Sequence, residues 1–147
     1  MEQSLTVKSK YVSKFKSGYP LIFKEAIVNL NDVKEEGTIV KLIDERKQFV
    51  AKGYYGKQNK GYGWVLSRNE RELFDQNFFK KKLEAAITLR QHFYENPDTT
   101  AYRIFNGEGD GIGGVTIEYF AGYYLIQWYS IGIYTFKEYI INALKEL

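Results

Sequence analysis

The sequence predicts an α+β protein: a small β-barrel, then a long connecting helix, then an incomplete β-β-α unit. Aromatic residues make up 17% of the 147 residues, and most are Tyr and Phe, which favour strands. Short strand-like segments separated by Gly, Asn and Asp fill the first 67 residues. From Asn69 onward the apolar residues recur at helical spacing, so we expect two units, residues 1–70 and 71–147.

The first unit begins with a strand expected at residues 5–7. Ser9 can act as the N-cap of a short helix that ends at Gly18, because glycine tolerates the left-handed conformation of a helix exit. Pro20 forces its predecessor Tyr19 into an extended conformation. Further strands are expected at residues 21–23, 26–30, 38–43, 49–55 and 63–67.

The second unit opens with the connecting helix. Asn69 and Glu72 have the spacing of a capping box, and Pro97 marks the helix end. The residues that recur at helical spacing in this segment are Phe79, Leu83, Ala86, Ile87, Arg90 and Tyr94.

The last part of the chain predicts a hairpin and a helix. Strands are expected at residues 101–105 and 115–120, and the Ala121-Gly122 pair turns the chain into a third strand at residues 123–129. Thr135 and Glu138 form a second capping box, which opens a helix that reaches the end of the chain.

The composition excludes several kinds of chemistry. With no Cys, the chain holds no disulfide, thiolate metal site or Cys nucleophile, and one histidine, His92, argues against a His-based metal site. We therefore expect neither a catalytic residue nor a metal in this chain. No apolar run approaches the ~18 residues of a membrane helix, and no signal peptide is visible, so we expect a cytoplasmic protein.

Positive charge is concentrated near the start of the chain. Residues 1–60 hold 12 Lys and Arg against 7 Asp and Glu, a net charge of +5, whereas residues 61–147 carry −2. This asymmetry favours a polyanion partner, although lysines on a small domain can also serve solubility alone. Lysines interleaved with aromatic rings beside a Gly turn can hold RNA phosphates while a ring stacks on a base. The candidate RNA-binding residues are Lys8, Lys10, Lys14, Lys16, Gly18 and Tyr19.

A second motif lies at residues 106–114, where five of nine residues are Gly and the only acids are Glu108 and Asp110. A dinucleotide fingerprint is excluded because a strand follows the loop and two acids repel phosphate. A calcium loop would need more oxygen ligands, and nothing else indicates the sugar cleft of a glycosidase. The residues themselves favour a specialised hairpin connection whose acids accept backbone N–H groups.

These motifs resemble a known family, the bacterial SAM-dependent ribosomal RNA methyltransferases of the RlmI type. KSGYPLIF at residues 16–23 and FVAKGYY at residues 49–55 resemble segments of the family's PUA domain. YRIFNGEGDGIGGVTI at residues 102–117 resembles the signature RlvNGEGDGlPGltvD of the next, EEHEE-type domain. The signature residues carried over are Asn106, Gly107, Glu108, Gly109, Asp110 and Gly111. Gly113 replaces the usual Pro, which predicts a looser turn, and Tyr19 and Leu21 replace the usual His and Trp.

The resemblance implies an N-terminal portion that positions 23S ribosomal RNA for an absent Rossmann-like catalytic domain. In the family that domain binds S-adenosyl-L-methionine, and a Cys thiolate adds to carbon 6 of a cytosine so that carbon 5 can take the methyl group. This fragment alone is then expected to be inactive and to bind no cofactor. The alternatives are a stand-alone PUA-type RNA-binding module and a protein-interaction domain without RNA. The incomplete sheet further predicts an unpaired edge and homodimerisation through it.

Overall fold

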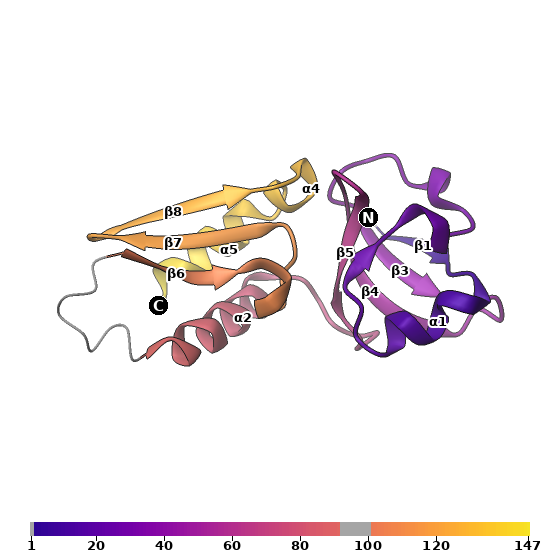
Figure 1. Cartoon of the computed structure of the whole chain (residues 1–147), viewed down its shortest axis with the longest axis horizontal. Helices are drawn as coiled ribbons and strands as arrows, with labels where there is room; N and C mark the ends of the chain where they lie inside the picture. The colour runs from indigo at the N-terminus through magenta and orange to yellow at the C-terminus, as the bar shows by residue number, and fades with distance from the viewer. Residues whose placement is uncertain (1, 92–100) are drawn as a thin grey trace.

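The computed structural model describes residues 2–91 and 101–147, and it confirms the mixed α+β class. His92 and Tyr94, which the sequence places near the end of the connecting helix, lie outside the described residues. Figure 1 shows two sheets side by side, each with its own helices.

The first sheet contains five strands in the order β1-β3-β4-β5-β2. β1 runs parallel to β3, and the other pairs are antiparallel. The helix α1 packs against this sheet through the fully buried Phe15. The strands and α1 are β1 (Glu2–Thr6), α1 (Ser9–Lys16), β2 (Leu21–Ile22), β3 (Ile39–Ile43), β4 (Phe49–Gln58) and β5 (Gly61–Ser67).

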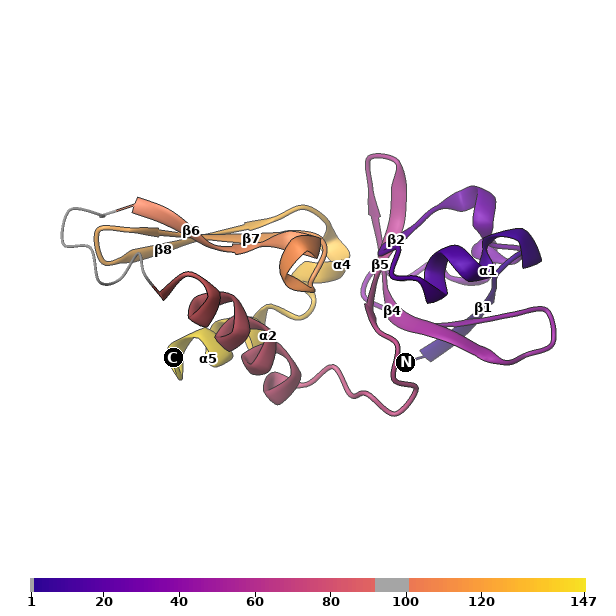
Figure 2. The same cartoon turned by 60° about the horizontal axis from the view of Figure 1, so that its bottom comes forward.

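The second sheet contains three antiparallel strands in the order β6-β7-β8. Figure 2 shows α2 and α5 together on one face of this sheet, and no described element covers the other face. Ala121 and Gly122 both have positive φ, 43° and 94°, which confirms the tight hairpin between β7 and β8. The elements are α2 (Gln76–Leu89), β6 (Ala101–Asn106), η3 (Gly107–Asp110), β7 (Val115–Phe120), β8 (Tyr123–Trp128), α4 (Ile131–Tyr134) and α5 (Lys137–Lys145).

The connecting helix begins later than predicted. Asp75, and not Asn69, caps it by accepting the backbone N–H of Phe78 at 3.0 Å. Lys52 is only 7% exposed, and its side chain donates to the carbonyl oxygens of Glu70 and Glu72. Those two carbonyls are therefore drawn toward β4, which keeps the segment before Asp75 out of the helix.

Three other local predictions are wrong. The strand expected at residues 26–30 is replaced by two single 3₁₀ turns, η1 (Lys24–Ala26) and η2 (Leu30–Asp32), with one bridge between Val7 and Ile27. Ser9 is the first residue of α1, and not its cap. Thr135 does not open a helix, because its hydroxyl donates backward to the Gly132 carbonyl at 2.7 Å, and Ser130 caps α4 instead.

One hydrophobic core joins the two sheets. Tyr54, Trp64 and Leu66 come from the first sheet, and they belong to the same buried cluster as Phe79 and Phe136 from the second half of the chain. The contact between the sheets is thus built like a protein interior, and it holds the two in a fixed relation.

Candidate nucleic-acid interface

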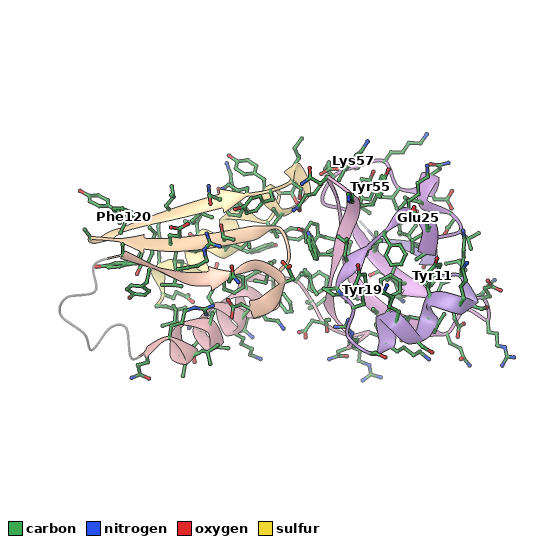
Figure 3. The ribbon with its side chains drawn as sticks, viewed as in Figure 1. Tyr11, Tyr19, Glu25, Tyr55, Lys57 and Phe120 are labelled. Atoms are coloured by element: carbon green, nitrogen blue, oxygen red, sulfur yellow. The ribbon has the colours of Figure 1, made fainter. Side chains whose placement is uncertain are left out.

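Two of the candidate lysines lie with the aromatic side chains of the first sheet. Lys10 and Lys14 are four residues apart and so share one side of α1. The Lys14 ammonium lies 4.3 Å from the Tyr19 ring centroid and 5.3 Å from that of Phe23, and the Lys10 ammonium lies 5.2 Å from that of Tyr11. We call this group of Lys10, Lys14, Tyr11, Tyr19 and Phe23 the lysine–aromatic patch; Figure 3 labels its two tyrosines.

The patch rests on a rigid base. The buried Phe15 ring stacks on Phe23 with centroids 5.8 Å apart. Arg68, from the end of β5, donates to the backbone carbonyls of Phe15 and Tyr19, both at 3.2 Å. Burial of this guanidinium lowers the pKa of Arg68. The turn at Gly18, with φ of +118°, is thus tied to the sheet.

The remaining candidates lie outside the patch. Lys16 is two positions beyond Lys14, which places it about 200° around the helix. Lys8 lines a separate cleft together with Lys24 and Glu25. Tyr19 is half-buried with Lys14 over its ring, so a base stacks on Tyr19 only where Lys14 moves aside. The sequence grouped four lysines, and the structure places two of them with the rings.

The acid-rich loop is built around Asp110. Its carboxylate, 7% exposed, accepts two hydrogen bonds from Arg90 at 3.3 and 2.8 Å and the backbone N–H of Asn106 at 2.7 Å. Gly111 follows with φ of +98° and ends the 3₁₀ turn η3. The interpretation as a hairpin connection therefore holds for Asp110, whereas the exposed Glu108 carboxylate has no such partner among the described residues.

The end of the same loop meets the first sheet. The Tyr54 hydroxyl donates to the Gly113 carbonyl at 2.6 Å, and Trp64 packs flat against Gly113, where a Cβ would lie 2.0 Å from the indole Cδ2. Burial raises the pKa of the Tyr54 hydroxyl. The turn at Gly113 is therefore held tightly, contrary to the looser turn expected from glycine at this position.

A cleft opens beside this contact. No local sequence pattern indicates it, because its walls come from distant segments. It has a volume of about 230 Å³. We call it the seam cleft. Its walls include Gln58, Trp64, Asn106, Glu108, Thr116 and Tyr129.

Two kinds of feature, a membrane-spanning helix and a metal-binding cluster, are absent from residues 2–91 and 101–147. No helix there is long and apolar enough to cross a membrane. Nor does this part of the chain gather three or more His, Cys, Asp or Glu side chains in a way that could hold a metal ion.

The chain is similar to known proteins in sequence and in fold. Residues 5–68 match the family model of a PUA-like domain. Over 144 residues, the chain is 54% identical to "Putative ribosomal RNA large subunit methyltransferase YwbD" of Bacillus subtilis (strain 168). It is 30% identical over 131 residues to ribosomal RNA large subunit methyltransferase I of Klebsiella pneumoniae. The chain is homologous to the RlmI-type ribosomal RNA methyltransferases. The homology covers 97% and 88% of the chain in these two comparisons.

The RlmI-type homologues are much longer than this chain, which spans 36% of the Bacillus protein and 32% of the Klebsiella protein. Two solved structures, described as "a putative methyltransferase complexed with SAH" and "a putative sam-dependent methyltransferase from Streptococcus mutans", match it with a TM-score of 0.87. Each is 31% identical and is matched over 97% of this chain and 37% of its own length.

The described residues do not fit S-adenosyl-L-methionine. A nucleotide-type site needs a Gly-rich loop that leads from a strand into a helix N-terminus. The Gly-rich loop of this chain leads from β6 into β7 and carries two acids. We therefore assign the cofactor no position on these residues.

Proposed function

We propose that this chain holds structured ribosomal RNA for a cytoplasmic, SAM-dependent methyltransferase that modifies carbon 5 of a cytosine in 23S ribosomal RNA. In this proposal residues 1–70 are the RNA-binding domain and residues 71–147 connect it to the rest of the enzyme. The methyl transfer itself lies outside this chain, which has no Cys to act as nucleophile. The lysine–aromatic patch on a PUA-like domain is the observation that carries the proposal.

The patch suits RNA for two reasons. Its ammonium groups are exposed and unpaired with any described carboxylate, so they remain available for phosphate. Each lysine lies over a ring, so positive charge and aromatic side chains stand together at one place, and a base can stack on Tyr19 where Lys14 moves aside. Phosphate contact and base stacking are the two interactions that bind unpaired RNA.

Replacing both Lys10 and Lys14 with Ala is expected to weaken RNA binding and to reduce its salt dependence. Each lost phosphate contact lowers the slope of log affinity against log salt by about 0.7 to 0.9. The slope of the double variant should therefore be lower by about 1.4 to 1.8. Fluorescence anisotropy with a labelled 23S segment at several salt concentrations measures this slope.

The matched control replaces Lys81 and Lys145 with Ala. Both lysines are exposed on the helices of the second sheet, so this variant removes the same charge from another part of the surface. An equal loss of slope in both double variants would show that binding depends on overall charge, and it would overturn the patch as the binding site. A salt-independent affinity would instead favour a protein-interaction domain.

We also propose that the isolated chain forms homodimers through β8, the exposed edge of the second sheet. β8 pairs only with β7 among the described strands, and Tyr123 and Leu125 on it are 77% and 53% exposed. Strands with unpaired backbone groups and apolar side chains attract further strands. Light scattering should show a mass that rises with concentration, and Leu125→Lys should shift it to the monomer. A monomer at every concentration would contradict the proposal.

A further inference from the structure

We propose that the seam cleft binds one unpaired guanine of the RNA. This inference rests on the proposed RNA-binding function and adds a base-specific contact to it. The cleft is formed jointly by β4 and β5 of the first sheet and by the acid-rich loop and β7 of the second sheet. Its volume of about 230 Å³ is sufficient for a single base, and it is open to solvent on one side.

Two amide side chains in the cleft have N–H groups left for a ligand. The Asn106 oxygen Oδ1 accepts from Arg103 at 3.0 Å, and the Gln58 oxygen Oε1 accepts from the Trp64 indole N–H at 3.2 Å. These bonds orient the two amides, and each amide nitrogen can then donate to a ligand.

The acceptor in the cleft is the Glu108 carboxylate. Glu108 lines the cleft and is exposed, and its carboxylate receives no hydrogen bond or ion pair from any residue in the described part of the chain. Its neighbour Asp110 is fully engaged by Arg90 and by the Asn106 backbone. Of the two acids in the signature loop, Glu108 alone is thus available to a ligand.

A carboxylate beside amide donors matches the Watson–Crick edge of guanine better than that of any other base. Guanine presents two adjacent N–H donors, which a carboxylate accepts in a bidentate fashion, and next to them a carbonyl oxygen that an amide N–H can reach. Adenine and cytosine place a lone pair next to their amine, and uracil flanks its one N–H with two carbonyls. In each of these three bases, one carboxylate oxygen would face an acceptor.

The test uses labelled uridine pentanucleotides whose central base is guanine, hypoxanthine, adenine or uracil. Fluorescence anisotropy at low salt should show the guanine oligonucleotide bound on the order of tenfold more tightly than the all-uridine one. Hypoxanthine, which differs from guanine by the missing 2-amine, should lose most of that preference. Glu108→Gln should abolish it, because an amide has one acceptor oxygen where the bidentate pairing needs the two oxygens of a carboxylate.

Glu84→Gln is the matched control, because Glu84 is an exposed carboxylate on α2 and does not line the cleft. This variant removes the same charge and should keep the guanine preference. Binding without any preference, or the same loss in both variants, overturns the guanine site and leaves the RNA-binding proposal standing. No binding of any oligonucleotide at low salt overturns both.

Discussion

Replacing Asp110 with Ala should lower the free energy of unfolding by about 3 kcal/mol, because the removal of one partner leaves a largely buried charge unpaired. Arg90, 18% exposed, would lose both of its carboxylate hydrogen bonds, and the Asn106 backbone N–H would lose its acceptor. We expect a loss of stability at the lower end of the range for broken buried ion pairs, because Arg90 retains some access to water. Urea unfolding followed by tryptophan fluorescence measures the change.

The control for this prediction lies two residues earlier. Glu108→Ala removes the same type of group from the same loop, but from an exposed position without a described partner, and should leave the stability nearly unchanged. Asp110→Asn keeps an oxygen that can accept the Asn106 N–H, so it should lower the free energy of unfolding by less than Asp110→Ala does. A loss below about 1 kcal/mol in Asp110→Ala would show that the ion pair does not hold the loop.

Replacing Gly113 with Ala should destabilise the protein by about 3 kcal/mol, the upper part of the range for overpacked cores. The added Cβ would lie 2.0 Å from Cδ2 and 2.4 Å from Cγ of Trp64. The indole is 9% exposed, and its N–H is bonded to Gln58, so it has little freedom to move. Thermal and urea unfolding of the variant would measure the loss.

Two further variants test the cause of that loss. Gly109→Ala adds the same methyl group to the same loop where the nearest atom, Nδ2 of Asn106, is 3.8 Å away, and it should be nearly neutral. Trp64→Leu combined with Gly113→Ala should recover part of the loss in a double-mutant cycle, because the clash is removed. Additive effects of the two substitutions would show that Gly113 and Trp64 are not coupled.

Local sequence patterns predicted the structure correctly where the interacting residues lie close together in the sequence. The β7–β8 hairpin followed from the Ala121-Gly122 pair, because both residues adopt the positive φ that a two-residue turn needs. The helix exit at Gly18 was also predicted from glycine's tolerance of the left-handed conformation, and Gly18 has a φ of +118°. The start of α2 could not be predicted in this way, because Lys52, some 20 residues earlier, draws the Glu70 and Glu72 carbonyls out of a helical pattern.

The same distinction between local and long-range contacts applies to the candidate site. The sequence indicated that Lys10, Lys14 and Tyr19 belong to one surface, since they lie within ten residues of each other on one helix and its exit turn. It could not show that Lys14 covers the Tyr19 ring. The seam cleft could not be predicted from the sequence, because Gln58 and Trp64 meet Glu108 only when the two sheets pack together.

The α+β class, the hairpin, the basic helix and the resemblance to the RlmI-type enzymes were all predicted from residues close together in the chain. The tertiary structure was needed to show which acid of the signature loop is held by folding contacts and which has no side-chain partner among the described residues. Asp110 and Glu108 occupy equivalent positions in an alternating Gly/acid pattern. The difference arises because α2 brings Arg90 to Asp110, a contact between residues 20 positions apart that no local periodicity encodes.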